Sequence, residues 1–427
     1  MRIGILGGGL SGIVMAYLLQ DKVENIDILE KEIQVGGLCR SFNLKDVTFD
    51  VGPHIIFSKN QEVLTLMVDM LGDNIVKLRR NNKIYFKGKF IKYPFENDLG
   101  SLPEEDKQYC VTRFLKNPYT FQTPTNMQQF FLTTFGEGIT YSYLQPYNEK
   151  IWKYDPSFMD TQMVERVPIP PASDILRSAN GIPTEGYQHQ LYFYYPKQGG
   201  IQSLVKAFID KLSQKVRIIP NSAVMNVIKQ ESTWIVRTPN QIRTYDYLIS
   251  TIPIPELTDT LAHVPDGVRE AVCDLKYNSL YTLAVNVKKD NLKDYLAVMV
   301  PDKDIIFHRV TKLNSLMPSD ILTLLVEVTY HRGDLINLLS PRTLYQRVVS
   351  DLIKVGFIDS HEDYISAEVV STKYAYVIYD LNHQKNMKII REFYDKLGIC
   401  LCGRFGEHRY LNMDTVIENC LEKVKTI

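Results

Sequence analysis

The stretch that decides the fold begins with RIGILGGGLSG at residues 2–12. Residues 2–6 are predicted to form a short buried strand. Apolar residues at helical spacing from Leu10 to Leu18 predict a helix that begins inside the glycine loop. A second predicted strand, residues 26–30, ends in Glu30. This order of strand, glycine loop, helix, strand and acid predicts a dinucleotide-binding unit.

Each part of this unit has a physical purpose. Gly7 permits the tight turn, Gly9 lets the backbone approach a pyrophosphate, and Gly12 lets the helix pack closely on the strand. The helix N-terminus offers free N–H groups and a partial positive charge to the phosphates. Glu30 is expected to accept hydrogen bonds from a ribose.

The composition excludes several other classes of protein. The 427 residues include 49 basic and 49 acidic side chains, so the chain has no overall charge that favours nucleic acid or an anionic membrane. The six cysteines match no zinc pattern or disulfide scaffold, and no metal site is expected. No signal peptide and no apolar run long enough to span a membrane is visible, so we expect a soluble cytoplasmic protein.

Two motifs after Glu30 narrow the choice of cofactor. Residues 31–41 read KEIQVGGLCRS, and residues 50–54 read DVGPH. An acid followed by these motifs resembles the FAD family of amine oxidases, protoporphyrinogen oxidase, phytoene desaturase and UDP-galactopyranose mutase. The resemblance implies that Gly36, Gly37 and Arg40 line the pyrophosphate and ribityl region of FAD, and that the segment ending in His54 approaches the isoalloxazine ring.

Members of this family assemble the FAD domain from separated segments, and this chain permits the same arrangement. We expect an α/β fold with a Rossmann-type FAD-binding domain built from residues 1–95, 195–260 and 390–427. Strands predicted at 216–220 and 223–229 belong to it, and Val224 is placed to contact the adenine. Residues 100–190 are expected to form a helical substrate or cap domain. Residues 265–385 are expected to form a second, mixed or antiparallel sheet.

The middle of the chain favours one branch of the family. Residues 93–97 (YPFEN) and 146–152 (PYNEKIW) resemble two nucleotide-contacting segments of UDP-galactopyranose mutases. The resemblance implies a substrate-binding role for Tyr93, Phe95, Asn148 and Trp152. Tyr376 is placed like a tyrosine that faces the sugar or the phosphate.

Two arginines and a C-terminal signature complete the resemblance. Arg166 and Arg309 occupy the positions of the two arginines that hold the diphosphate in that branch. Residues 403–414, GRFGEHRYLNMD, match the flavin-binding signature. This match implies that Arg404, Tyr410, Asn412 and Met413 bind the cofactor, with Tyr410 also facing the substrate.

The branch implies an unusual reaction. N5 of reduced FAD attacks the anomeric carbon of a nucleotide sugar, and the pyranose and furanose forms interconvert, a step that feeds cell-surface glycan synthesis. The protein supplies position and charge. Arg166, Arg309 and His54 are the expected catalytic residues, because guanidinium groups can hold a diphosphate leaving group bidentately. A reductant such as NAD(P)H or a reductase must keep the flavin reduced.

Three departures leave the base and the sugar open. Met299 stands where the branch has a tyrosine, Glu96 stands where an amide is expected to contact the uracil edge, and Val377 replaces a proline. A thymidine- or uridine-linked sugar other than galactose is therefore compatible with the sequence.

Two other functions also remain open from the sequence. The shared N-terminal motif is equally typical of an FAD-dependent oxidoreductase of the amine oxidase or protoporphyrinogen oxidase type. The paired arginines have no obvious purpose on a neutral substrate of such an enzyme. A non-catalytic member that kept the fold as a binding module is the third possibility.

Overall fold

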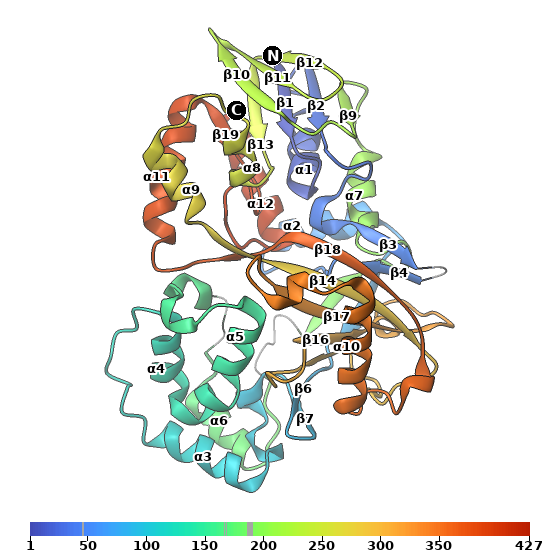
Figure 1. The fold of residues 1–427 in the computed structure, drawn as a ribbon, viewed down its shortest axis with the longest axis vertical. Helices are drawn as coiled ribbons and strands as arrows, with labels where there is room; N and C mark the ends of the chain where they lie inside the picture. The colour runs from blue at the N-terminus through green and yellow to red at the C-terminus, as the bar shows by residue number, and fades with distance from the viewer. Residues whose placement is uncertain (45–46, 166, 168, 186–190) are drawn as a thin grey trace.

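The computed structural model describes residues 1–44, 47–165, 167, 169–185 and 191–427, and it contains three packed parts (Figure 1). A parallel sheet lies at the top of the view, a group of helices at the lower left, and a large mixed sheet across the middle and lower right. Within the described residues, none of the helices combines the length and apolar character that crossing a bilayer requires.

The first part is a five-stranded parallel sheet in the order β19-β13-β1-β2-β9. Ile3, Ile5, Ile26 and Ile28 are fully buried, as expected for parallel strands that are covered on both faces. The strand bounds are β1 Arg2–Leu6, β2 Asn25–Leu29, β9 Val216–Ile219, β13 Tyr247–Ser250 and β19 Ile399–Leu401.

Helices cover one face of this sheet, and a mixed layer covers the other. The first layer contains α1 Leu10–Leu19, α2 Gln61–Leu71, α7 Gln202–Ile209 and α12 Met413–Lys423, which share one apolar core. The second layer contains β10 Asn226–Gln230, β11 Thr233–Arg237, β12 Ile242–Tyr245, α8 Ile254–Asp259, α9 Asp266–Cys273 and α11 His383–Leu397. The chain therefore returns to this part from three separate regions of the sequence.

The second part is a seven-stranded mixed sheet in the order β18-β14-β17-β16-β15-β6-β7. Its pairs are antiparallel except β15 with β6. The helix α10, Pro341–Lys354, packs on one face with a continuous apolar core. The strand bounds are β6 Asn82–Phe86, β7 Lys89–Lys92, β14 Lys276–Val287, β15 Ala297–Met299, β16 Arg309–Lys312, β17 Leu322–Tyr330 and β18 Tyr364–Ile378.

The third part is helical and packs around a separate apolar core. Its helix α5, Gln145–Trp152, is fixed to the mixed sheet by polar side chains. The Lys150 ammonium donates to the carbonyl oxygens of Val300 and Asp302 at 2.8 and 2.6 Å. The helix bounds are α3 Glu104–Leu115, α4 Met127–Ile139, η4 Thr140–Leu144 and α6 Ala172–Ala179, with short turns η2 Phe95–Asn97, η3 Leu99–Ser101, η5 Pro156–Phe158 and η6 Thr161–Val164.

Short elements join these parts. Two antiparallel pairs, β3 Ser41–Leu44 with β4 Val47–Asp50 and β5 Val76–Arg79 with β8 Tyr192–Tyr195, share an apolar core with the mixed sheet. The remaining short turns are η1 Gly37–Cys39, η8 Leu313–Ser315, η9 Leu335–Leu338, η10 His361–Asp363 and η11 Val424–Thr426.

The expected fold class, a Rossmann-type unit from discontinuous segments with a helical insertion and a second sheet, is confirmed. One boundary needs correction. Residues 1–95 were grouped with the first part, but β6 and β7 belong to the seven-stranded sheet, where β6 pairs with β15. The reason is that a strand pairs with whatever edge the folded chain presents, and nothing local in residues 82–92 encodes a partner more than 200 residues away.

Candidate functional site

The glycine loop between β1 and α1 is shaped by steric necessity. Gly7 has φ +106°, and a Cβ there would lie 2.5 Å from Thr251 Oγ1. A Cβ on Gly12 would overlap the carbonyl oxygen of Gly7. Gly9 differs, because its Cβ would meet nothing nearer than 3.8 Å, and its backbone lines a cavity. The loop therefore opens the N-terminus of α1 onto empty space.

A second glycine segment, Gly36 and Gly37, lies directly against the glycine loop. The Gly36 N–H donates to the Gly8 carbonyl at 2.8 Å, and Gly9 and Gly36 form an isolated parallel bridge. Gly37, with φ +58°, would bring a Cβ to within 3.1 Å of the Gly9 Cα. Arg40 follows this pair, and its Nε donates to the Gly37 carbonyl at 3.0 Å. The two backbone segments form a cradle that no side chain fills.

Glu30 closes one end of the cavity. Its carboxylate accepts the backbone N–H of Gly8 at 2.7 Å and of Glu32 at 3.0 Å. Val224 lies in the loop before β10 and lines the same end. The acid that ends β2 is thus held beside the glycine loop by backbone donors.

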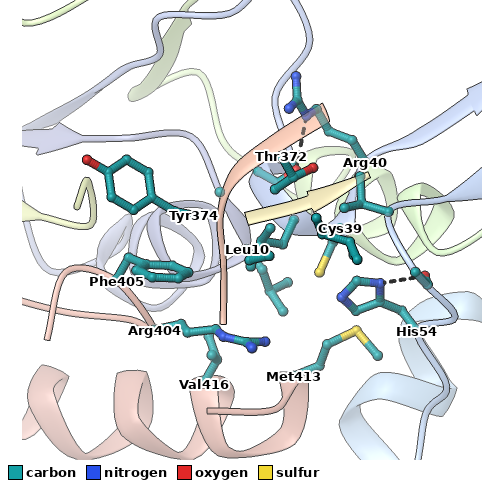
Figure 2. Close-up of a pocket in the computed structure, with 18 of the residues that line it drawn as sticks. Leu10, Cys39, Arg40, His54, Thr372, Tyr374, Arg404, Phe405, Met413 and Val416 are labelled. Atoms are coloured by element: carbon teal, nitrogen blue, oxygen red, sulfur yellow. Dashed lines mark hydrogen bonds between the residues drawn. The ribbon is translucent and has the colours of Figure 1, made fainter. Parts of the chain in front are cut away.

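The cavity has a volume of about 1020 Å³ and runs between the parallel sheet and the mixed sheet. Figure 2 shows part of its wall, with side chains from the glycine loop, the 36–54 segment, β18 and the C-terminal signature. Most of the residues singled out from the sequence line it, namely Gly7, Gly9, Glu30, Gly36, Gly37, Arg40, His54, Tyr93, Val224, Arg309, Tyr376, Arg404, Tyr410, Asn412 and Met413. Gly12 lies beneath the loop and does not line the cavity.

His54 lines the middle of the cavity together with Cys39, Arg404 and Met413 (Figure 2). Its Nδ1 lies 3.1 Å from the Gly52 carbonyl oxygen. Burial and the guanidinium groups of Arg404 and Arg309, partly opposed by the Gly52 carbonyl, together lower the pKa of His54 to about 4. The ring is therefore neutral at physiological pH and lies in a positive potential.

Arg404 is a buried guanidinium with unmet donors. Its Nε and Nη2 are buried and have no hydrogen-bond partner among the described residues. The group lies over the ring of Tyr410 at 4.3 Å and over that of Tyr376 at 5.5 Å. Because buried donors are almost always satisfied, these atoms indicate an acceptor that the chain itself does not supply.

Arg309 lies deeper, where the mixed sheet forms the cavity wall. Its Nε and Nη2 both donate to the carboxylate of Glu327, with 2.6 Å between Nη2 and Oε1. Burial disfavours the charge of Arg309, but the Glu327 carboxylate outweighs this and raises the pKa of the guanidinium. Nη1 has no ion-pair or hydrogen-bond partner in the described part of the chain, so one edge of the group remains available to a ligand.

A second cavity of about 660 Å³ adjoins the first. Tyr93, Ile151, Tyr410 and Leu411 line both, so they form the boundary between them. Asn148 and Trp152 of α5 line the second cavity, and the Trp152 Nε1 donates to the Asn148 Oδ1 at 2.7 Å. The Asn148 amide is thus used to orient the indole, while its Nδ2 donates to the carbonyl of Leu144.

Aromatic rings meet at this boundary. The Trp152 ring is edge-on to both Tyr376 and Tyr410, with centroids 5.7 Å apart in each case. Burial raises the pKa of Tyr376, and the Glu327 carboxylate adds to this effect. The hydroxyl therefore stays protonated and is a neutral hydrogen-bond donor.

One residue expected at the site lies elsewhere. Phe95 is fully buried in the helical core, where its ring stacks on Tyr143 at 5.0 Å, and it lines neither cavity. It can act on the site only by supporting its neighbours. Arg166 lies outside the described residues.

Glu327 was not predicted as a site residue, although its sequence context contains a signal. The run LTLLVEVTY at 322–330 is apolar on both sides of one acid, which marks that acid as buried and in need of a partner. Arg409 was also missed: it lines the second cavity together with Glu165, Glu418 and Glu422. The sequence shows that Arg409 belongs to the C-terminal signature, but it does not show that the side chain lines the second cavity.

Comparisons with known proteins place the chain in a family. Residues 10–403 match the family model described as flavin containing amine oxidoreductase. The chain is 23% identical over 201 residues to the dTDP-fucopyranose mutase of Escherichia coli, which covers 44% of this chain and 52% of that protein. It is 24% identical over 202 residues to the UDP-galactopyranose mutase of Mycoplasma pneumoniae, covering 43% of this chain and 49% of that protein. These matches span about half the length of each curated relative.

The fold is similar to that of a solved structure of reduced UDP-galactopyranose mutase. The TM-score is 0.90 at 24% sequence identity, covering 99% of this chain and 94% of that one. The dinucleotide cradle, the discontinuous Rossmann-type unit and the match over residues 10–403 agree, and the chain belongs to the FAD-binding family of flavin-containing amine oxidoreductases.

Proposed function

We propose that this protein is a flavin-dependent mutase that interconverts the pyranose and furanose forms of a nucleotide sugar. The observation that carries the proposal is the position of Arg309. Its guanidinium lines the cavity that also contains the dinucleotide cradle, and Tyr93 and Tyr410 connect this cavity to a second one. A diphosphate bound by Arg309 would join a sugar on one side to a nucleoside on the other.

The residues present fit FAD. The glycine cradle is suited to a pyrophosphate, Glu30 to a ribose, and the unmet donors of Arg404 to an electronegative part of the flavin. Gly36, Gly37, Arg40, Val224, Asn412 and Met413 complete the proposed cofactor set. When bound in its reduced form, FAD would supply the nucleophile for the anomeric carbon of the substrate.

The proposed role of Arg309 is to stabilise the diphosphate as it leaves the anomeric carbon. Glu327 fixes one edge of the guanidinium, so its Nη1 side is presented to the ligand without a loss of rotamer entropy on binding. The Glu327 carboxylate also offsets much of the positive charge of Arg309. The attraction between Arg309 and the diphosphate would therefore depend on short hydrogen bonds more than on long-range electrostatics. Arg166 is proposed as the second diphosphate ligand on the basis of the resemblance alone.

His54 would serve this reaction as a neutral group. Donation from Nδ1 to the Gly52 carbonyl leaves Nε2 of the neutral ring as an acceptor. A neutral imidazole does not compete with the arginines for the diphosphate. An acceptor at this position can take a hydrogen bond from a sugar hydroxyl or from the flavin.

The second cavity would receive the nucleoside. Trp152, held by Asn148, offers an indole for stacking, and Tyr93, Tyr376 and Tyr410 offer hydroxyl groups at the boundary where the diphosphate would lie. Glu165, Glu418 and Glu422 on the outer wall disfavour a phosphate there, which orients the ligand with its diphosphate inward.

The departure at Glu96 is compatible with this proposal. Burial raises the pKa of Glu96 to about 7, so the carboxyl is substantially protonated at neutral pH. Glu96 is buried and lines neither cavity, so its carboxyl imposes no contact on the base. Both uridine- and thymidine-linked sugars are therefore suitable test substrates.

The decisive experiment uses the purified FAD-loaded protein with UDP-galactopyranose and with dTDP-fucopyranose. Each is incubated with oxidised and with reduced flavin, and the furanose product is followed by chromatography and by its anomeric NMR signal. We expect conversion only with reduced flavin, without net consumption of reductant. NAD(P)H and a reductase are compared as sources of the electrons.

Other outcomes separate the alternative functions. Conversion at equal rates with oxidised flavin would refute the proposed chemistry. Bleaching of oxidised flavin by an amine or carbon substrate, with no sugar conversion, would support the oxidoreductase. Tight nucleotide binding by flavin-free protein without conversion would support a binding module.

A further inference from the structure

The mixed sheet presents alternating side chains to the large cavity. In β15 and β16, Ala297, Arg309 and Thr311 line the cavity, whereas Val298 and Val310 point to the opposite face and pack in the core beneath α10. Because side chains alternate along a strand, the cavity wall here is set by backbone geometry and does not depend on flexible loops.

Strand register arranges these side chains in two rows. One row runs from Asn82 of β6 through Ala297 to Thr311. The neighbouring row contains Met299 and Arg309. The rows are two residues apart along each strand, which corresponds to about 7 Å. That separation is comparable to the length of a sugar ring.

The first row contains polar atoms without partners. The Thr311 side chain is fully buried, and its Oγ1 has no hydrogen-bond partner within the described ranges. The Oδ1 of Asn82 is also buried and lacks a partner there. Between them, Ala297 contributes only a methyl group, and these three residues form what we call the recess. Asn82 and Thr311 both line the cavity, and unmet buried polar atoms on such residues point to a ligand with hydroxyl groups.

Around this row the wall is mainly apolar, with Arg80 beside it, whose guanidinium lies 5.9 Å from the centroid of the Phe57 ring. Phe57, Leu296 and Leu316 line the cavity near the same row, and they offer no hydrogen bonds. The polar groups of the recess are therefore few and placed at defined positions, as in sites that recognise one part of a small molecule.

We propose that the recess between Asn82 and Thr311 holds the end of the sugar ring that lies farthest from the anomeric carbon. This inference rests on the proposed function, because it assumes that Arg309 holds the diphosphate next to that carbon. Thr311 donates to or accepts from one sugar hydroxyl, and the Asn82 Oδ1 accepts the proton of another. The two side chains select hexoses by the hydroxyl groups at this end of the ring.

The test compares ligand binding by isosteric variants of the FAD-loaded protein. Thr311→Val and Asn82→Leu remove the polar atoms and keep the side-chain volume. The probes are UDP, UDP-galactopyranose, dTDP and dTDP-fucopyranose, measured by calorimetry and by the flavin absorbance change. We expect each variant to bind the preferred nucleotide sugar about 3- to 10-fold more weakly, with an unchanged affinity for the free nucleoside diphosphate.

Thr140→Val is the matched control. Thr140 is fully buried, its Oγ1 has no partner among the residues the structure describes, and it lines neither cavity. It should lose no ligand affinity. A loss of FAD affinity in Thr311→Val with unchanged sugar binding would assign the recess to the flavin and overturn the proposal. Equal weakening of free diphosphate and nucleotide sugar, or no weakening, would also overturn it.

The experiments distinguish a failure of the recess proposal from a failure of the mutase proposal. Wild-type protein that interconverts a sugar, with Thr311→Val and Asn82→Leu indistinguishable from it, overturns the recess alone. Wild-type protein that binds a nucleotide sugar through the recess without interconverting it overturns the mutase alone. Wild-type protein that binds nucleotide sugars no better than free diphosphates overturns the recess as well.

Discussion

Arg309 and Glu327 are direct cross-strand partners on β16 and β17, and they form a two-point ion pair whose carboxylate is fully buried. A buried pair of this kind contributes little net stability, but removal of one partner leaves an uncompensated charge. Arg309, the proposed diphosphate ligand, therefore also contributes to the stability of the mixed sheet.

Arg309→Ala should therefore lose both activity and stability. We expect a loss of about 3–5 kcal/mol in the free energy of unfolding, because Glu327 is left buried without a partner. The double variant Arg309→Ala/Glu327→Gln should recover most of that stability, since the amide carries no charge, but none of the turnover. Thermal unfolding and sugar conversion measured side by side check this. Recovered turnover in the double variant would contradict a role of Arg309 in holding the diphosphate.

Arg404→Met should reduce the flavin content while leaving the fold intact. The side chain has no hydrogen-bond partner for its buried Nε and Nη2 among the described residues, so its loss breaks no such internal bond there. We expect at least about tenfold weaker FAD binding from the loss of charged donors. The ratio of flavin to protein absorbance and the melting temperature of the flavin-free protein measure the two effects. Arg237→Met, on an exposed position of β11, is the matched control.

The glycines of the loop should separate into two classes. Gly12→Ala should destabilise the protein with or without flavin, by about 3 kcal/mol or more, because the added methyl overlaps a backbone oxygen. Gly9→Ala should fold normally and bind FAD more weakly, because its methyl enters the cavity without a clash. Gly267→Ala, with open space around it, is the control. Urea unfolding and FAD titration distinguish these outcomes.

Stability should fall as the pH is lowered from 6.5 to 4. Burial lowers the pKa of four histidines, to about 4 for His54 and His383, to about 3 for His408, and well below the ordinary value for His308. In this window the unfolded chain binds protons at these positions and the folded chain does not. Their contribution to stability is present above pH 6.5 and is lost on acidification.

Two buried acids oppose this trend. Burial raises the pKa of Asp50 to about 6 and that of Glu96 to about 7, so the folded chain takes up protons there before the unfolded chain does. Among these six groups the histidines outnumber the acids, so they favour a net uptake of protons on unfolding near pH 5 and a loss of stability on acidification. Urea midpoints at pH 7.5, 6 and 5 measure the slope. The variant His408→Gln should make the dependence of stability on pH weaker, and Glu96→Gln should make it stronger. If both variants changed this dependence in the same direction, the opposite roles given to buried histidines and buried acids would be wrong.

The sequence predicts those residues of the candidate site whose role depends on local backbone conformation. Gly7 and Gly12 are dictated by a turn and a close contact, so a local motif reports them. Residues 36–40, 404, 405 and 410–413 also line the cavity, and their binding of FAD stays a prediction. Phe95 shows the limit, because the motif that contains it is near the site while its ring faces the helical core.

The sequence by itself determined the parallel nucleotide unit, since alternation, helical spacing and glycine positions are local properties of the chain. Only the tertiary structure decided that Arg309 meets Glu327, that Arg404 lies over Tyr410, and that β6 joins the second sheet beside β15. The physical reason is register. A strand carries its side-chain alternation in its sequence, but its neighbour is selected by packing of the whole chain, and a shift of one residue would turn the Arg309 side chain to the other face.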